Sequence, residues 1–549
     1  FARSVAQTGF PGTDLSRFEQ TGFFAQAKWE PLPRLSVTLG LRYDVLGSPI
    51  APPTNTGFST AFGSLYPGIR NDGTIDGTSR VAPRLSFNYS LDSARMTQAR
   101  GGIGVFLGRS PWVWISNSYG NAGFGRYTLT ARPTNLTSYL ATDFDPANPM
   151  GVGPTPAPGS TQTINFIEPG LKLPTNLRGN LAFDRKLPGL SATLSVEYVY
   201  TKQIEAMFYD NLNLRVLNGD AQNRPTAASY GADGRLRFAT NTAGTAAGAS
   251  NAPLVTGYGN VLRLRNVNAG ESHYVAIVLD RPFKNGWAYS LAYTRGRATE
   301  AQPAGSSTAG SNWGFNIVFN QGQVEVTRSD YEIRDRVQAS FSKEFVYFNR
   351  LKSIVSLVYE GRTGQPFSYV YGGASSFAAD LNKDGNGSND VVAVPTGATD
   401  PRFDFSGMTS AQQAAYFAFL DQSGLSKYAG GYAPRNAFTT SWQNRLDLRF
   451  TQEVKTVGPV VLELFADFLN FGAWLSDDLF NYVETIATST SNSNQNRALG
   501  SATYTATGLI RPTVTLNTDG TINFPATSII LPNNSDARWR IQAGVRLKF

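Results

Sequence analysis

The closing stretch of the chain, from Asp536 to Phe549, alternates between apolar and polar side chains. One side of an extended strand would carry Trp539, Ile541, Ala543, Val545, Leu547 and Phe549. The other side would carry Arg538, Arg540, Gln542, Gly544, Arg546 and Lys548. A period of two over this length predicts a β-strand with one apolar and one polar face. Because the polar face is cationic and the chain ends on an aromatic residue, the pattern favours the wall of a membrane-spanning barrel.

The same alternation recurs along the chain and is clearest from Leu35 to Leu46. Tight connections such as Lys284-Asn-Gly286 are typical of hairpins, and they alternate with long polar loops. We treat Gly259–Asn266 as part of a loop hairpin and Ser410–Gln422 as a short helix capped by Ser410. We expect about thirteen membrane-crossing strands, at residues 23–30, 35–46, 80–91, 96–108, 178–187, 191–202, 272–283, 287–297, 334–346, 351–362, 444–454, 460–470 and 538–549.

The predicted fold class is therefore all-β: a transmembrane antiparallel β-barrel with long extracellular loops and short periplasmic turns. Mean hydropathy is −0.23, and no run of about 18 apolar residues is present, which excludes a transmembrane helix. Since the C-terminus of such a barrel is periplasmic, counting strands backward places residues 1–22 in an extracellular loop. A soluble all-β protein is the alternative, but it has no reason to gather its long loops at one end.

The residue content restricts the chemistry of the chain. There is no cysteine and a single histidine, His273, which excludes disulfides and thiolate metal sites and leaves little for nucleophile–histidine catalysis. We therefore predict no enzymatic activity and interpret His273 as a polar residue at the barrel rim. The formal charge of +8 is spread over many strands. We assign it to the lumen and to a rim facing anionic lipid headgroups, and we predict no nucleic-acid partner.

One loop has the spacing of a metal site. Oxygen-bearing side chains alternate in the first half of a calcium-loop pattern, with Gly385 at the sharp turn, and the predicted ligands are Asp380, Asn382, Asp384, Asn386 and Asp390. The twelfth position is Val391 where a closing glutamate is usual, so Asp390 would have to substitute from one residue earlier. The alternative is an ordinary Asn/Asp/Gly turn. Ca²⁺ is the one cofactor that the sequence predicts.

Two further sets of side chains are candidates for ligand contact. The loop aromatics Trp112, Trp114 and Tyr119 are placed to stack on a sugar or a peptide. On the lumen side we expect ion pairs across neighbouring strands, between the carboxylates Glu463 and Asp467 and the guanidinium groups Arg445 and Arg449. These pairs serve either as charge balance on a wet wall or as a ligand-selective lining.

Five stretches carry a family resemblance: FFAQAKWEPLPRLSVTLGLRYDV at 23–45, GESHYVAIVLDRPFKNGWAYSLAYTRGR at 270–297, DLNKDGNGSNDVV at 380–392, PRNAFTTSWQNRLDLRFTQEV at 434–454 and ELFADFLNF at 463–471. The first resembles a strand pair of TonB-dependent outer-membrane receptors, and the other four resemble the Oar-like branch of that family. Their order is more specific than any one motif, and the resemblance covers nearly the whole chain from residue 23. The closing Trp539, Val545, Leu547 and Phe549 resemble the signal that the barrel-insertion machinery reads.

The resemblance implies a barrel of about 22 strands filled by an N-terminal plug, in the outer membrane of a Gram-negative bacterium. Residues 1–549 would be the C-terminal portion of that one barrel domain, with the plug and the N-terminal domain absent. The first and last strands would then pair with strands from a preceding segment and not with each other.

The function implied by the resemblance is that of a TonB-dependent receptor, which binds a ligand at its extracellular loops and lets it pass, with energy input, through a plugged lumen. The implied partners are outer-membrane lipid and lipopolysaccharide, the N-terminal part of the same barrel and the TonB energy-coupling complex. A surface scaffold or adhesin-like protein that holds partners by its loops is the alternative. A porin-like open channel is the third.

Overall fold

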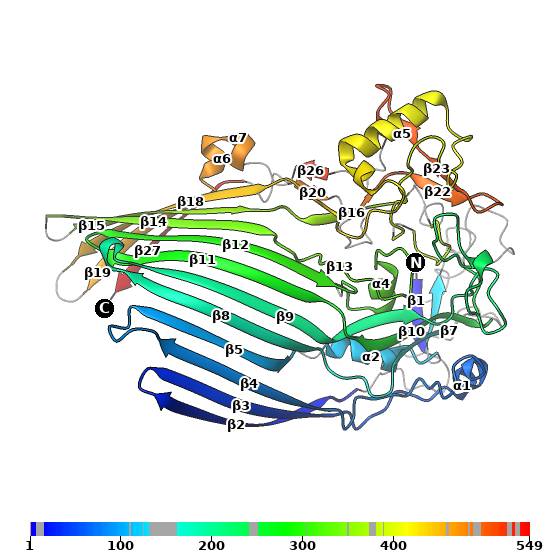
Figure 1. Cartoon of the computed structure of the whole chain (residues 1–549), viewed down its shortest axis with the longest axis horizontal. Coiled ribbons are helices and arrows are strands. Elements are labelled where there is room, and N and C mark those ends of the chain that lie inside the picture. Colours follow the sequence, from blue (N-terminus) through cyan, green and yellow to red (C-terminus); the bar gives the residue numbers. More distant parts are fainter. Residues whose placement is uncertain are drawn as a thin grey trace, which may run out of the picture.

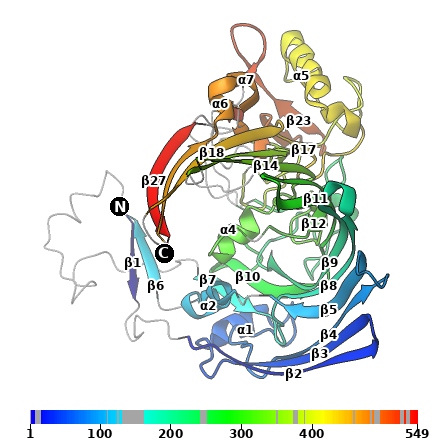
Figure 2. The same ribbon diagram turned by 90° about the vertical axis from the view of Figure 1, so that its left-hand side faces the viewer.

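A computed structural model gives the arrangement of the chain (Figure 1). It describes residues 2–6, 16–108, 111–123, 126–130, 162–240, 251–303, 305–348, 351–372, 380–387, 389–456, 460–480, 484–486, 496–523, 530–532 and 538–548. The main feature is one large, mostly antiparallel sheet that curves about the long axis of the molecule (Figure 2). No helix in these ranges is both long and apolar enough to cross a membrane.

Thirteen strands follow one another in this sheet, each hydrogen-bonded to the next. They are β2 (Glu19–Leu32), β3 (Leu35–Gly47), β4 (Ser79–Ser90), β5 (Thr97–Leu107), β8 (Thr175–Leu187), β9 (Ala192–Asn211), β11 (Glu271–Lys284), β12 (Trp287–Glu300), β14 (Asp335–Tyr347), β15 (Leu351–Arg362), β18 (Gln443–Lys455), β19 (Val461–Leu469) and β27 (Arg540–Lys548). Every predicted membrane-crossing strand is present, and the prediction of an all-β antiparallel architecture is confirmed.

The strand register separates an apolar convex face from a polar concave face. On the convex face Ile541 pairs with Phe468, and Val545, which is 67% exposed, pairs with Leu464. On the concave face Arg546 pairs with Glu463, and their side chains form an ion pair of 3.1 Å. Trp539, Val545 and Leu547 of the predicted insertion signal are exposed, whereas Phe549 lies outside the described residues. Their role as a signal stays a prediction.

Short turns lie at one end of the sheet and long connections at the other (Figure 1). The turn between β11 and β12 consists of Asn285 and Gly286, whose φ angles are 55° and 74°. These left-handed conformations suit Asn-Gly and close a tight hairpin whose twist matches that of the strands. Short and long connections alternate in the sequence, and in space they therefore lie at opposite ends of the sheet.

The sheet does not close on itself. In the part of the chain that the structure describes, β2 pairs only with β3, and β27 pairs only with β19. Figure 2 shows the curved wall with its first and last strands apart. Both edge strands therefore present unpaired backbone N–H and C=O groups, which are costly in lipid.

The long connections after β3, β5, β9, β12, β15 and β19 pack together at one end, and we call this packed region the cap. Its helices are α1 (Thr56–Phe62), α2 (Trp112–Gly120), α4 (Ala309–Gly314), α5 (Ser410–Ser423), α6 (Gly472–Leu475) and α7 (Asp477–Phe480). Short 3₁₀ turns are Pro188–Leu190, Ala227–Ser229 and Leu425–Tyr428, of which the first lies at the short-turn end.

The remaining strands are short or lie on the cap side of the sheet. They are β1 (Ala2–Ala6), β6 (Arg126–Thr130), β7 (Gln162–Ile167), β10 (Tyr258–Val267), β13 (Thr327–Arg328), β16 (Pro366–Val370), β17 (Phe438–Thr439), β20 (Glu484–Ile486), β21 (Asn496–Ala498), β22 (Ser501–Tyr504), β23 (Ile510–Thr513), β24 (Thr515–Leu516), β25 (Ile522–Asn523) and β26 (Ile530–Pro532).

Two local predictions have different outcomes. Gly259–Asn266 is not a local hairpin: it belongs to β10, which pairs antiparallel with the end of β9 and parallel with β7. Periodicity predicts a strand there but not its distant partners. The helix predicted at Ser410–Gln422 is α5, although its N-cap is Thr409, whose side chain accepts a hydrogen bond from the backbone N–H of Gln412. It ends at Gly424 in the left-handed conformation, as expected.

The hydrophobic core of the molecule lies in the cap and not inside the sheet. One buried cluster gathers Tyr369, Phe403, Tyr416, Leu420 and Ile510, which come from four separate segments. Packed side chains from distant segments exclude water between the connections, so the cap is a folded body placed over one end of the curved wall.

We predict that a charge is tolerated on one face of the wall and not on the other. Leu291 lies on the convex face between Leu279 and Ala339, whereas its neighbour Ser290 lies on the concave face beside Asp280. Leu291→Arg should lower the free energy of unfolding in a bilayer by about 2–4 kcal/mol, because lipid cannot solvate the guanidinium. Ser290→Arg is the matched control, and its free energy of unfolding should stay near that of the parent protein. Equal losses of unfolding free energy in the two variants, measured by denaturant unfolding, would show that Leu291 does not face lipid.

Candidate functional site

The concave face of the sheet is lined by charged and amide side chains. A concavity of about 590 Å³ lies along β2, β3, β4, β5, β8 and β9, and its polar lining includes Gln26, Arg84, Asn176, Arg178 and Glu197. Beside it Arg100 bridges two carboxylates, at 2.9 Å from Asp184 and 3.5 Å from Glu197. Fixed charges of both signs on a concave wall favour a polar solute or a polar polypeptide surface over an apolar one.

The predicted ion pairs near the last strands are present in part. Arg449 lies 3.3 Å from Asp467, as expected from the facing of β18 and β19. Glu463 instead pairs with Arg546 and Lys548 of β27, and Arg445 pairs with Asp447 on its own strand at 3.0 Å. The prediction that Glu463 pairs with β18 is wrong because the closing strand, which lies on the other side of β19, carries two cations at the same level.

The three loop aromatics lie together in α2 and take part in the packing of the cap. Tyr119 is only 2% exposed, and its hydroxyl donates to the carbonyl oxygen of Ile50 at 2.6 Å. The Trp112 ring stacks on Phe18 with the ring centres 5.0 Å apart, and Trp114 Nε1 donates to the carbonyl oxygen of Ser306 at 2.7 Å. These contacts fix the orientation of all three rings. Their role in ligand stacking stays a prediction.

A buried guanidinium joins segments of the cap that are far apart in the sequence. The Arg235 side chain has no exposed surface and donates to Asp390 Oδ1 at 2.9 Å and to the carbonyl oxygen of Val391 at 2.6 Å. It also lies 3.3 Å from Asp233 and 4.7 Å from the centre of the Phe319 ring. A lone buried charge would be very costly, so its partners are needed to keep it there. Sequence reasoning missed this residue, since nothing local distinguishes it.

The predicted calcium loop is a compact, buried turn. Asp380 accepts from the backbone N–H groups of Asp384 at 3.1 Å and Gly385 at 2.8 Å, while Asp384 accepts from Asn386 at 2.7 Å. Gly385 has φ +99°, as the sharp turn requires. The two oxygens of Asp390 accept from Arg235 and from the backbone N–H of Leu381. The sequence pattern therefore predicted the shape of this loop, but not that Asp390 would face a guanidinium.

Burial is the main cause of a raised pKa at two carboxyl groups of that loop, and repulsion among the carboxylates adds to it. Burial, together with the carboxylates of Asp384 and Asp390, raises the pKa of Asp380 to about 9. Burial and Asp390 raise the pKa of Asp384 to about 7. A cation would relieve this repulsion, and Asp380, Asn382 and Asp384 supply oxygens of the type that Ca²⁺ prefers. Among the residues that the structure describes, however, no three acidic or histidine side chains are grouped as a ready metal site.

Residues 2–513 match a family model described as an outer membrane beta barrel domain. The chain belongs to this family. Among curated proteins none matches the chain. The family assignment agrees with the curved thirteen-strand wall and its apolar convex face, and it places the chain in the outer membrane.

Solved outer-membrane barrels are similar to this one at low identity. The transporter YddB from Escherichia coli is 10% identical, with a TM-score of 0.42, and the match covers 86% of this chain and 43% of that one. A mutant of the ferric enterobactin receptor PfeA from Pseudomonas aeruginosa is 10% identical, with a TM-score of 0.40 and coverage of 96% and 44%. The siderophore receptor PirA from Acinetobacter baumannii is 9% identical, with a TM-score of 0.37 and coverage of 82% and 41%. The chain therefore spans less than half the length of these structures.

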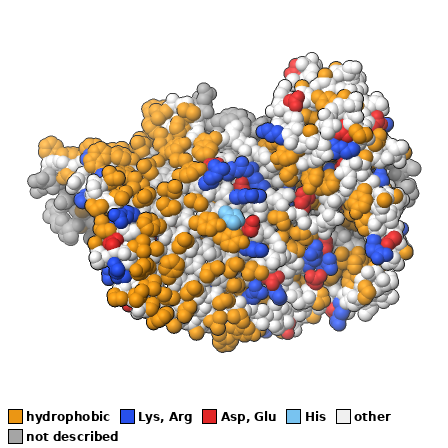
Figure 3. All heavy atoms as spheres, in the orientation of Figure 1, with side chains coloured by type: hydrophobic (Ala, Val, Ile, Leu, Met, Phe, Trp, Pro, Cys, Tyr) orange, Lys and Arg blue, Asp and Glu red, His pale blue; other side chains and the backbone are white. Residues whose placement is uncertain are grey.

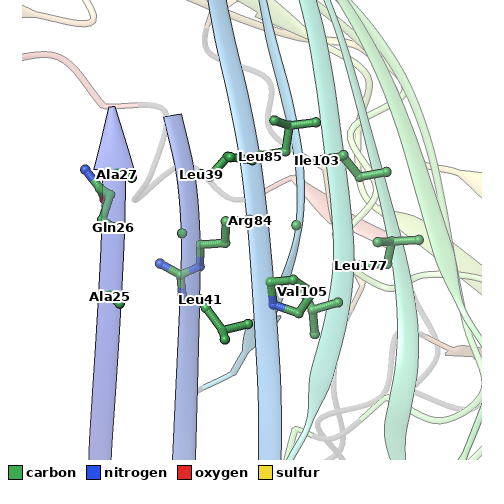
Figure 4. Close-up of a pocket in the computed structure, with 13 residues that line it drawn as sticks. Ala25, Gln26, Ala27, Leu39, Leu41, Arg84, Leu85, Ile103, Val105 and Leu177 are labelled. Atoms are coloured by element: carbon green, nitrogen blue, oxygen red, sulfur yellow. The ribbon is translucent and has the colours of Figure 1, made fainter. Parts of the chain in front are cut away.

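The convex face of this outer-membrane barrel is its lipid-facing wall. Apolar side chains cover the part toward the short turns, and Lys and Arg gather toward the cap (Figure 3). Leu39, Leu85, Ile103 and Leu177 project to the same side of four strands and line a shallow apolar groove, whereas Arg84 points the other way (Figure 4). The apolar side chains of this groove offer contact to lipid chains.

His273 lies on the outward register of the barrel, near the cap end of β11. Its Nδ1 is 2.7 Å from the Tyr198 hydroxyl, and its ring centre is 5.0 Å from that of Tyr200. Glu271 lies 3.5 Å from its Nε2. Aromatic and polar side chains of this kind are typical of the membrane–water boundary. This position agrees with the interpretation of His273 as a rim residue.

We predict that calcium orders the loop at 380–390. If Asp380, Asn382 and Asp384 hold the ion, Ca²⁺ should slow hydrogen exchange of the Asp384, Gly385 and Asn386 amides relative to chelator, because it removes the carboxylate repulsion. Asp384→Asn should abolish that difference. Asp519→Asn, in a separate exposed turn of the cap, is the control and should leave it unchanged. Identical exchange in Ca²⁺ and in chelator would show that the loop is an ordinary Asx turn.

Proposed function

We propose that this chain forms the wall and external loops of a TonB-dependent receptor, which binds a ligand at the cap and lets it pass along the lumen when energy is supplied. The single observation that carries the proposal is the combination of a folded cap with a concave charged wall that leads away from it. The ion pairs of Arg100 with Asp184 and Glu197 lie along that path. The Oar-like assignment rests on the sequence resemblance.

The alternative is a surface scaffold or adhesin-like protein. Its favourable observation is that the cap has its own large core, so that its outer surface is well formed and suited to holding a partner protein. A scaffold would need the cap but not the charged lumen wall, so the two functions make different demands on the molecule.

The test is uptake that depends on both the protein and the energy source. Cells with and without the gene would be given labelled ferric enterobactin, a labelled maltodextrin and labelled short peptides, with and without a protonophore. We expect at least one compound to accumulate only when the protein and the proton gradient are both present. Accumulation that survives the protonophore would indicate an open channel. The scaffold would be favoured by two results together: no compound accumulates in a protein-dependent way, and the deletion strain loses partner proteins from its surface.

We further propose that strands from another segment complete the barrel at both edges of the sheet. The support is that β2 and β27 each have one paired edge and one open edge within the described residues. An energised pathway needs a closed wall, and a closed wall leaves no backbone groups unpaired in lipid. A barrel of about 22 strands would have room for a plug, which this segment would supply together with the contact to the TonB complex.

Disulfide formation tests how the edges pair. Ala25 on β2 faces Leu41 on β3, so Ala25→Cys with Leu41→Cys should cross-link in the native membrane and serves as the positive control. A set of cysteine pairs placed between β2 and β27, including Ala25→Cys with Ala543→Cys, should not cross-link. Efficient cross-linking of any β2–β27 pair would mean that this chain closes its own barrel.

Outer-leaflet lipopolysaccharide is the proposed lipid partner at the cap end of the wall. Arg295 and Arg297 are exposed on the outward register of β12, and Lys202 lies on the same face of β9. Arg295 pairs with Asp335 at 3.1 Å, whereas Lys202 and Arg297 form no ion pair in the described part of the chain. Free cations beside an apolar wall suit a lipid that carries phosphate groups.

A further inference from the structure

The short helices α6 and α7 stand on the outer side of the wall, at the cap end of β18 and β19 (Figure 2). Asn444 Nδ2 of β18 donates to the carbonyl oxygen of Leu479, and Asn470 Nδ2 donates to that of Phe480, each at 3.2 Å. Asn444 shares the outward register of Leu446 and Leu448. The helix pair is therefore fixed to the lipid-facing side of the barrel and is not folded into the cap core.

Three large apolar side chains of this helix pair are exposed. Trp474 is 71% exposed, Leu475 60% and Leu479 58%, and they are among the most exposed large apolar side chains of the described residues. Large exposed apolar groups in a cluster mark a contact surface. The water-filled lumen cannot be that contact, because the helices stand on the opposite face of the sheet.

Aromatic rings connect this surface to the wall below it. Phe468 lies on the outward register opposite Ile541. Its ring centre is 6.4 Å from that of Phe471, which is 5.6 Å from the ring of Trp474. In Figure 3 the apolar protrusion at the upper edge, where Figure 1 places α6 and α7, is continuous with the apolar wall. The cover of that wall is lipid, since the chain is an outer-membrane barrel.

Backbone polarity sets how deep the helices can lie. Trp474, Ser476 and Phe480 donate their backbone N–H groups within the helix pair, to Phe471, Gly472 and Ser476. Backbone groups of these short helices that have no partner in the protein need water or polar headgroup atoms, which excludes the hydrocarbon centre. The boundary between headgroups and acyl chains satisfies both the backbone and the rings, and tryptophan is enriched there.

We propose that α6 and α7 form a membrane anchor in the outer leaflet, with Trp474, Leu475 and Leu479 directed into the upper acyl region beside the barrel. The occupant of this surface is lipid and not a protein partner. The inference rests on the outer-membrane placement of the wall, but it requires neither ligand transport nor coupling to TonB.

The chain has no cysteine, which permits a direct test by site-specific labelling. Trp474→Cys, or Leu475→Cys should the first variant fold poorly, would carry an environment-sensitive fluorophore in the protein isolated from the outer membrane. The protein would be reconstituted in phosphatidylcholine vesicles that contain a lipid spin-labelled near the headgroup. Leu464→Cys on the lipid-facing wall and Asp421→Cys on α5 are the membrane and aqueous controls.

We expect the label on α6 to be quenched by the spin-labelled lipid and protected several-fold from aqueous iodide, as at position 464. The label at position 421 should show the reverse. If the label on α6 behaves like that at 421 while position 464 contacts lipid, the helices stand in water and the anchor is refuted, with the proposed transport function unaffected. If position 464 is also open to iodide, the wall itself is not in lipid, and the outer-membrane function fails together with the anchor.

Discussion

Backbone hydrogen bonding in a medium without water is the constraint on which the structure depends. A strand in lipid must give every N–H and C=O group to a neighbouring strand, and thirteen strands do so in one continuous antiparallel ladder. The side chains are then free to alternate, so that Ile541 and Val545 face outward while Arg546 meets Glu463 inside. Within the described residues the two open edges, on β2 and β27, are the exception.

Apart from α6 and α7, the cap obeys a different rule from the wall, because water and not lipid surrounds it. Its long connections bury a core of aromatic and aliphatic side chains and are joined by buried charges such as Arg235 and Asp390. The chain has no cysteine, so no disulfide can cross-link these connections. Packing and ion pairing between distant segments therefore perform the role that disulfides serve in many extracellular domains.

Strands of the wall could be predicted from the sequence because their signal is local. A side-chain period of two is visible within a single strand of the wall, and the Asn285-Gly286 pair by itself predicts a tight turn. Contacts of the cap could not be predicted, because they depend on residues far apart in the sequence, 69 positions for Tyr119 and Ile50 and 192 for Trp114 and Ser306. Tyr119 and Trp114 looked like free loop aromatics until their partners Ile50 and Ser306 were known. The four-residue helices α6 and α7 are too short to show a helical period. The sequence therefore does not predict that Trp474 lies on an exposed helix.

The contacts of Arg235 have a consequence for how the outer surface can change over evolutionary time. This one side chain bridges the connection after β9 and the connection after β15, 155 residues apart at Asp390. An insertion or deletion in either connection would move Arg235 or Asp390 and leave the other charge buried without its partner. Here the loops are constrained to vary as a set, so new surfaces should arise at the tips of the cap and seldom at its base.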